Sequence, residues 1–157
     1  MKKVFFFVCC FFFCCAAWAW PPVYKENVAH GNFWGLYEGE CRDFLADLGL
    51  KQDYMEFERC ISSPESQGAP MEAVYRVAGR DAAQAEQFMQ ERFAIPALKF
   101  VCCYWEMGTY RVRYIDKRTG VDYYMSISSE ETLHNQREEW GEIGYFYISV
   151  EVFRKEI

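Results

Sequence analysis

Four cysteines beyond the N-terminal segment carry the most defined chemistry in this sequence: Cys41, Cys60, Cys102 and Cys103. The other four of the eight cysteines lie in an N-terminal segment that we expect the mature protein to lose. An even number of cysteines in an exported chain favours a disulfide framework. Two histidines and no Cys-x-x-Cys spacing give no support to a zinc site. We therefore predict disulfides, with no metal site and no cofactor.

The adjacent pair in "KFVCCYWE" (99–106) bears on how the cysteines pair. Side chains alternate across a strand, so Cys102 and Cys103 in a predicted strand point to opposite faces. Cys41 lies on the apolar face of a predicted helix, and Cys60 on the glutamate-bearing face of a predicted strand. We expect the bonds Cys41–Cys102 and Cys60–Cys103. Two alternatives stay open: a β-bulge would invert the faces and swap the partners, or Cys41 pairs with Cys60 and the adjacent cysteines bridge each other.

A redox switch at a vicinal Cys102–Cys103 bridge is a further alternative. No helix N-terminus and no Cys-x-x-Cys spacing nearby indicates a lowered thiol pKa. We expect structural disulfides instead. The loops that they close would be long, so the chain-entropy argument assigns roughly 4 kcal/mol of stabilisation to each bond.

Candidate catalytic residues gather in the polar stretch "SSEETLHNQREEW". His134 lies close in sequence to Ser129 and Glu130, which are the residue types of a hydrolase triad. No Gly-x-Ser-x-Gly turn accompanies them, and the stretch is equally typical of a solvated connection. We predict no catalytic residue and favour a protein without enzymatic activity. The alternative is a small periplasmic hydrolase or an enzyme inhibitor that uses the 129–140 loop.

Aromatic residues are in surplus. The chain without its first 19 residues keeps 23 aromatic residues among 138, and 11 of them are tyrosines. Several alternate with aliphatic residues along predicted strands, which places them on the outer side of the sheet. Exposed Tyr, Trp and Arg side chains are typical of binding surfaces. The candidate binding patch consists of Trp105, Arg111, Arg113, Tyr124, Tyr145 and Tyr147. Its partner would be an unknown protein, peptide or glycan of the envelope; alternatively, the rings only cover a thin sheet or lie beneath the N-terminal arm.

The N-terminus predicts export. The segment "MKKVFFFVCCFFFCCAAWAW" has two lysines, an apolar run of about 14 residues and an Ala-Trp-Ala cleavage site, the pattern of a signal peptide over residues 1–19. The run is shorter than the roughly 20 residues of a membrane span. We therefore expect a periplasmic or extracellular protein with no stable membrane span after cleavage. An uncleaved anchor is the alternative.

One domain follows the signal peptide. We expect a loose arm over residues 20–38, which contains two prolines, and a single domain over residues 39–157. Loss of Lys2 and Lys3 lowers the formal net charge from −6 to −8. Phosphate binding needs a basic surface, so the sequence predicts no nucleic-acid partner.

Hydrophobic periodicity gives the elements that position these residues. A period near 3.6 predicts helices over 39–49 and 81–93. Alternation predicts strands over 54–61, 71–78, 97–105, 110–115, 121–128 and 145–153. This order predicts an α+β fold: a mostly antiparallel sheet of about five to six strands, with two helices packed on one face and disulfides as staples.

Five short motifs carry a resemblance to a known family. In chain order they are "CRDFLADLGLK", "EFERC", "YRVAG", "CCYW" and "SEET". With this order and spacing, residues 41–157 resemble a family of small exported bacterial proteins of unknown function. The resemblance implies a cysteine framework and a bacterial cell-envelope setting. It implies no activity, ligand or catalytic residue.

Overall fold

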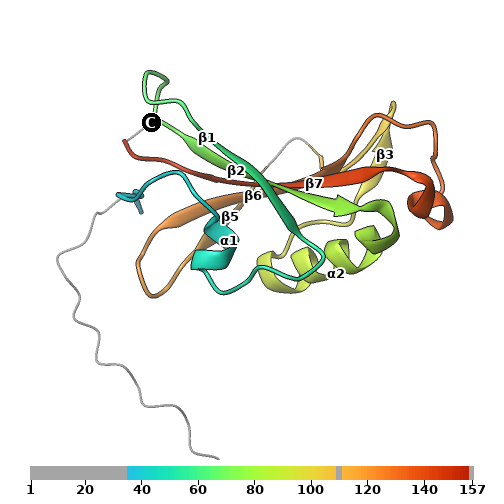
Figure 1. The fold of residues 1–157 in the computed structure, drawn as a ribbon, viewed down its shortest axis with the longest axis horizontal. Helices are drawn as coiled ribbons and strands as arrows, with labels where there is room; N and C mark the ends of the chain where they lie inside the picture. Colours follow the sequence, from blue (N-terminus) through green and yellow to red (C-terminus); the bar gives the residue numbers. More distant parts are fainter. Residues whose placement is uncertain (1–34, 109–110, 156–157) are drawn as a thin grey trace, which may run out of the picture.

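A computed structural model describes residues 35–108 and 111–155 of the chain. The expected signal peptide and most of the expected arm lie outside the described residues. The helices are α1 (Phe44–Asp47) and α2 (Ala82–Phe93), with the short 3-10 helices η1 (Gly79–Asp81) and η2 (Arg137–Glu142). The strands are β1 (Glu56–Ser62), β2 (Met71–Ala78), β3 (Lys99–Val101), β4 (Tyr104–Glu106), β5 (Val112–Ile115), β6 (Asp122–Ser129) and β7 (Tyr145–Val152), as Figure 1 shows.

The strands form one antiparallel sheet in the order β1-β2-β7-β6-β4-β3, and β5 also pairs with β6. The last strand, β7, therefore lies in the middle of the sheet, between β2 and β6. The sheet has seven strands rather than the five to six that we expected, because the predicted strand 97–105 is split into β3 and β4. The prediction of an antiparallel sheet accompanied by helices is confirmed.

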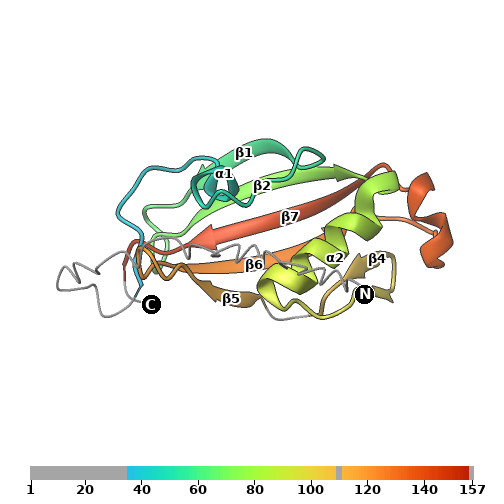
Figure 2. The same ribbon diagram turned by 90° about the horizontal axis from the view of Figure 1, so that it is seen from below.

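Helices lie on one face of this sheet. Figures 1 and 2 show α1 beneath β1 and β2, and α2 across the far half of the same face. The side chains of β7 that point to this face are all fully buried, namely Phe146, Ile148, Val150 and Val152. The apolar stripe of α2, formed by Ala82, Ala85, Met89 and Phe93, belongs to the same buried core. No helix of the described residues has the length and apolar composition to cross a lipid bilayer.

The first helix is much shorter than predicted. The periodicity favours a helix over 39–49, but α1 is a single turn. The Asp43 carboxylate accepts a hydrogen bond from the Ala46 amide at 3.1 Å and so caps the helix late. The helix then ends early, because Gly49 takes a positive φ of 68° and the Leu50 amide donates back to the Leu45 carbonyl at 2.8 Å.

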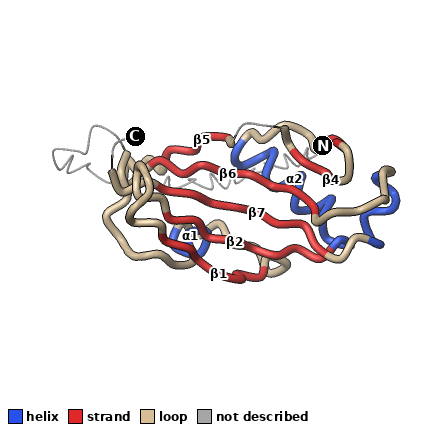
Figure 3. The backbone as a smooth tube through the Cα atoms, turned by 90° about the horizontal axis from the view of Figure 1, so that it is seen from above, coloured by secondary structure: helices blue, strands red, loops and turns tan. Residues whose placement is uncertain are grey.

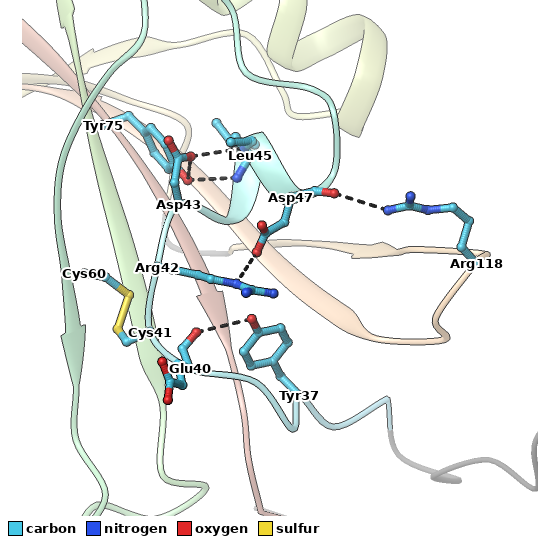
Figure 4. A network of polar contacts seen from close by, with 11 residues as sticks. Tyr37, Glu40, Cys41, Arg42, Asp43, Leu45, Asp47, Cys60, Tyr75 and Arg118 are labelled. Atoms are coloured by element: carbon cyan, nitrogen blue, oxygen red, sulfur yellow. Dashed lines mark hydrogen bonds and ion pairs between the residues drawn. A yellow bond between two sulfur atoms is a disulfide. The ribbon is translucent and has the colours of Figure 1, made fainter.

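Tyr75 of β2 connects this single turn to the sheet (Figure 4). Its buried hydroxyl donates to the Asp43 carboxylate at 2.9 Å and accepts from the Leu45 amide at 2.8 Å. Burial is the main reason why the pKa of the Tyr75 hydroxyl is raised. Partial burial alone would raise the pKa of Asp43, but hydrogen bonds from Lys51, the Ala46 amide and the Tyr75 hydroxyl outweigh it and lower that pKa.

The disulfide pairing that we expected is wrong. Cys41 is bonded to Cys60, with their Cα atoms 5.6 Å apart, and Cys102 and Cys103 are free thiols. The reason is a β-bulge, since the register of β1 against β2 shifts between Phe57 and Arg59. One extra residue in β1 turns every following side chain to the other face. Cys60 therefore points to the helix side and meets Cys41 there (Figure 4).

Candidate binding surface on the open face of the sheet

The face of the sheet opposite α1 and α2 is covered by no helix of the described residues (Figure 3). We call it the open face. Strand alternation and the paired registers define its side chains. Its centre is formed by Glu72, Val74, Arg76 and Ala78 of β2, Tyr145, Tyr147, Ser149 and Glu151 of β7, and Tyr124, Ser126 and Ser128 of β6. Apart from Val74 and Ala78, these side chains are polar or aromatic, which distinguishes the open face from the largely apolar helix side.

Both arginines of the predicted patch, Arg111 and Arg113, form ion pairs with carboxylates on this face. Arg111 forms ion pairs with Glu72 and with Glu151. Arg113 donates to the Asp122 carboxylate at 2.6 Å, and this hydrogen bond is the main cause of the raised pKa of Arg113. Arg113 therefore connects β5 to β6, and Arg111, directly before β5, connects to β2 and β7. They leave little unpaired charge for a partner.

Tyr124 belongs to the same end of the open face. Its ring is half-buried and meets the ring of Phe153 edge-to-face, with centroids 5.3 Å apart. The contact secures the segment that follows β7. Tyr124 therefore fits the alternative that the aromatic rings cover the sheet.

The other end of the open face carries a cluster of Arg76, Tyr145 and Tyr147, which we call the tyrosine cluster. Tyr145 keeps 38% of its surface exposed, and its ring centroid lies 6.5 Å from that of Tyr147. The Arg76 guanidinium lies over the Tyr145 ring at 5.0 Å, within the range of a cation–π contact. Arg76 also donates to Glu56 at 2.7 Å, which raises the pKa of Arg76. Its Nε is buried and has no hydrogen-bond partner among the described residues, so donor capacity remains.

A pocket of about 470 Å³ adjoins the tyrosine cluster. Its lining residues come from the loop before β1, the ends of β1 and β2, η1 and the start of β7: Asp53, Tyr54, Glu56, Arg76, Ala78, Arg80, Asp81, Gly144 and Tyr145. The Arg80 side chain is 82% exposed and lies 3.5 Å from the Asp81 carboxylate. Burial is the main cause of the raised pKa of Tyr54, and the charge of Asp81 adds to it. The pocket thus combines aromatic rings with charges of both signs.

Trp105 does not belong to this surface. It is only 5% exposed, and its indole N–H donates to the His134 carbonyl at 2.9 Å. The expectation that it lies on the outer side is wrong because the chain reverses at Cys102 and Cys103. Trp105 then pairs with Phe100 on the helix side and packs against Trp140, with ring centroids 5.1 Å apart.

An ion pair between the buried Glu86 and the partly exposed Arg137 holds the connection between β6 and β7, and the sequence patterns did not predict it. Glu86 of α2 is 7% exposed and binds Arg137 of η2 through two hydrogen bonds, of 2.6 and 3.0 Å. The Leu98 amide donates to Glu86 at 2.6 Å, and Arg137 donates to the Leu98 carbonyl at 2.7 Å. Arg137 also lies over the Trp140 ring at 4.7 Å. In the sequence, only the position of Glu86 next to the alanines of the predicted helix indicates that it is buried, and nothing indicates that Arg137 is its partner.

The residues of the predicted catalytic stretch are used within this connection. The Ser129 hydroxyl accepts from the Trp105 amide at 2.9 Å and donates to the Glu130 carbonyl at 2.7 Å. The Glu130 carboxylate accepts from the Gly144 amide at 2.8 Å. His134 is half-buried, and its Nδ1 lies 3.7 Å from a carboxylate oxygen of Glu139. Among the described residues no hydrogen bond joins Ser129 to His134, so the stretch assembles no nucleophile–base pair.

The fold and the surface define an α+β protein with a seven-stranded antiparallel sheet and one uncovered, aromatic and charged face. Residues 37–105 match a family described as a domain of unknown function (DUF4952), which confirms the resemblance to a family of unknown function. The match runs from Tyr37 through α1, β1, β2, α2 and β3 into β4, and it includes Cys41, Cys60, Cys102 and Cys103. No curated protein and no solved structure matches the chain.

Proposed function

We propose that this protein is a non-catalytic binding module of the bacterial cell envelope, and that the tyrosine cluster with its adjoining pocket receives a segment of a partner protein. The observation that carries the proposal is the exposed ring of Tyr145 beneath the Arg76 guanidinium at the rim of the pocket. Tyr and Arg are the residue types that most often dominate the free energy of protein association. A concave site with a few polar groups beside the rings supplies orientation as well as contact area.

A protein segment suits the chemistry of the pocket better than an ion does. The lining offers carboxylates and guanidiniums within one site, so it matches the alternating donors and acceptors of a peptide backbone and its side chains. The Arg76 side chain keeps 32% of its surface exposed, so its guanidinium can donate to a carbonyl or carboxylate oxygen of the segment. The other end of the open face is less suited, because its arginines are paired with Glu72, Glu151 and Asp122.

Export is supported by the Cys41–Cys60 bond. Disulfides persist in oxidising compartments and are rare in the reducing cytosol. The signal-peptide pattern of residues 1–19 agrees with this compartment. The hydrolase alternative receives no support from the geometry, since Ser129 and Glu130 serve the connection between β6 and β7.

The proposal is tested with three forms of the mature chain, all carrying the intact Cys41–Cys60 bond: wild type, the double variant Tyr145→Ala/Tyr147→Ala, and Tyr124→Ala. Tyr124 is the matched control because it is a tyrosine at the opposite end of the same face. Each immobilised form is exposed to envelope extract of the producing bacterium, and the captured protein bands are quantified. We expect the double variant to lose a specific band by about tenfold or more, as loss of a hot-spot cluster does, while Tyr124→Ala retains it.

Two results would count against the proposal. Equal capture by the wild type and the double variant would show that the tyrosine cluster is not the binding surface. Capture that survives protease treatment of the extract, but not removal of its polysaccharide, would make the partner a glycan rather than a protein. Unfolding curves of the three forms show whether any loss of capture reflects loss of the fold.

A further inference from the structure

Cys102 and Cys103 form the two-residue turn of the β3–β4 hairpin, in which Val101 pairs with Tyr104. Both thiols are free; Cys102 is exposed and Cys103 is half-buried. The Cys103 amide donates to the Val101 carbonyl at 2.7 Å, and the Cys103 carbonyl accepts from the Thr132 amide at 2.8 Å. The turn is thus tightly closed and attached to the connection after β6.

The backbone of Cys102 occupies an unfavourable region. Its φ is 59°, and two-residue hairpin turns with a positive φ at the first central position favour glycine there. A non-glycine residue in such a conformation is strained, and strained residues cluster at functional sites. Here it brings the two sulfur atoms to 3.3 Å, with the Cys103 thiol donating to the Cys102 sulfur.

The other two cysteines make a useful contrast. Cys41 and Cys60 are half-buried and bonded, with a Cα separation in the usual range for a structural disulfide. Adjacent residues joined by a trans peptide have Cα atoms only about 3.8 Å apart, below the usual disulfide range of roughly 4.4–6.8 Å. A bond between Cys102 and Cys103 would therefore be strained and more easily reduced than the Cys41–Cys60 bond.

We propose that Cys102 and Cys103 are a reversible thiol–disulfide exchange site at the tip of the β3–β4 hairpin, and that its substrates are aliphatic disulfides. Cys102 is the attacking residue, because it is the more exposed of the two, and its sulfur already lies 3.3 Å from the Cys103 sulfur that must later attack it. Cys103 is the resolving residue. The site is independent of the tyrosine cluster.

The exchange proceeds in two balanced steps. The Cys102 thiolate attacks one sulfur of the substrate disulfide; a mixed disulfide forms, the substrate S–S bond breaks, and the first substrate thiolate leaves and takes up a proton. Cys103 then loses its proton and attacks the Cys102 sulfur, which releases the second substrate thiolate. The cysteine pair has lost two electrons and two protons, and the substrate disulfide has become two thiols.

The second step requires the Cys103 thiol to lose its proton. The hydrogen bond to Cys102 is the largest cause of the raised pKa of Cys103, followed by burial and by the charges of Cys102 and Glu131. Titratable groups that face this thiol are therefore Cys102 and Glu131, with Tyr104 donating a hydrogen bond beside them. Since only the thiolate attacks, ring closure should accelerate as the pH rises toward the raised pKa of Cys103.

The test uses the mature chain with the Cys41–Cys60 bond intact and oxidised glutathione as the substrate disulfide. In the wild type we expect both thiols to disappear without a stable glutathione adduct, and peptide mapping should locate a Cys102–Cys103 bond. Cys103→Ser should accumulate a glutathione adduct on Cys102. Cys102→Ser should react about tenfold more slowly, because the more buried thiol then has to attack.

Three outcomes would overturn this proposal. They are two alkylatable thiols in the wild type after equilibration with excess oxidised glutathione, a stable glutathione adduct on the wild type, and a disulfide between two chains in place of the bond within one chain. Unchanged unfolding of both serine variants in the absence of glutathione ensures that the readout concerns the thiols and not the hairpin fold.

Discussion

Gly79 lies where the end of β2 meets η2, and the two backbones come so close that a side chain has no room. A Cβ built on Gly79 would lie 2.0 Å from the Ile143 carbonyl oxygen and 2.2 Å from that of Trp140. Both obstacles are backbone atoms, so relief requires η1 and η2 to separate. The pocket beside the tyrosine cluster is built from the same two segments, through Arg80, Asp81 and Gly144.

Gly79→Ala should therefore lower the free energy of unfolding by about 3 kcal/mol, at the upper end of overpacking effects. Gly141→Ala is the matched control, because a Cβ at Gly141 meets nothing within 4 Å. It should change the stability by no more than about 0.5 kcal/mol, as exposed substitutions usually do. Urea denaturation measures both, and a Gly79→Ala protein as stable as Gly141→Ala would contradict the close packing of η1 on η2.

Asp43 gives the domain a defined dependence on acid. Its folded-state pKa is lowered from the ordinary value of 3.8 by the Lys51, Ala46 and Tyr75 hydrogen bonds, against the opposing effect of burial. A carboxyl whose pKa is lower in the folded state stabilises the protein above its unfolded pKa. That stabilisation is lost as the pH falls through the folded-state value, so the window lies below about pH 4.

Asp43→Asn should thus be less stable than the wild type at pH 7 and should lose less stability between pH 4 and pH 2. Glu65→Gln removes a charge in the exposed loop between β1 and β2 and should keep the wild-type acid profile. Thermal unfolding as a function of pH measures the difference. Parallel profiles for Asp43→Asn and the wild type would show that the Asp43 network does not stabilise the fold.

The sequence predicted the wrong face of the sheet for side chains that follow a bulge or a turn inside a predicted strand. Alternation correctly separates Phe146, Ile148 and Val150 from Tyr145 and Tyr147 along β7, because that strand has no irregularity in either of its pairings. It misplaced Cys60, which follows the β1 bulge, and Trp105, which follows the Cys102–Cys103 turn. The bulge adds one residue to β1, and the turn reverses the chain between β3 and β4. Each change places the following side chains on the face opposite to the predicted one, and neither site contains a glycine that would indicate the change.

At the scale of elements, the Cys41–Cys60 bond joins the segment before α1 to the edge strand β1. This tie is needed because α1 is a single turn, and a helix so short is not stable by itself. The bond closes a loop with a sequence separation of 19 residues. The same segment is also held by Tyr75 and by the Tyr37 amide, which donates to the Phe153 carbonyl at 2.8 Å.

Cys41→Ser/Cys60→Ser should lower the free energy of unfolding by about 3 kcal/mol, the chain-entropy value for a loop of this length. Cys102→Ser/Cys103→Ser is the control, since it removes the same number of sulfur atoms and no structural bond; its loss should stay below about 1 kcal/mol. Denaturation of both variants without reductant makes the comparison. Equal losses would contradict the structural role of the Cys41–Cys60 bond.

The elements themselves were predicted unevenly. The sequence locates α2 well, because its buried stripe of Ala82, Ala85, Met89 and Phe93 keeps a strict helical period. It overestimates α1, since periodicity cannot show that Asp43 caps the helix late and that the chain turns out at Gly49. It also joins β3 to β4, because two cysteines in a run of β-forming residues do not indicate a turn.

On the scale of the whole molecule, one sheet carries both proposed sites, the tyrosine cluster and the Cys102–Cys103 turn. The helix side is filled by an apolar core, and the ion pair between the buried Glu86 and the partly exposed Arg137 fixes the long connection between β6 and β7. β7 follows this connection, begins at Tyr145 and lies in the centre of the sheet. The position of Tyr145 and Tyr147 in the tyrosine cluster therefore depends on the connection. The sequence predicts the class of fold and the outward tyrosines, but not the strand order, which rests on pairings between distant segments.

The central claim is that a partner protein contacts the tyrosine cluster on the open face. Its most direct test places a photo-reactive phenylalanine analogue at position 145 in one form of the protein and at position 124 in another, followed by illumination of intact cells. We expect a cross-linked adduct from position 145 and none from position 124. Cross-linking from neither position, or equally from both, would contradict it.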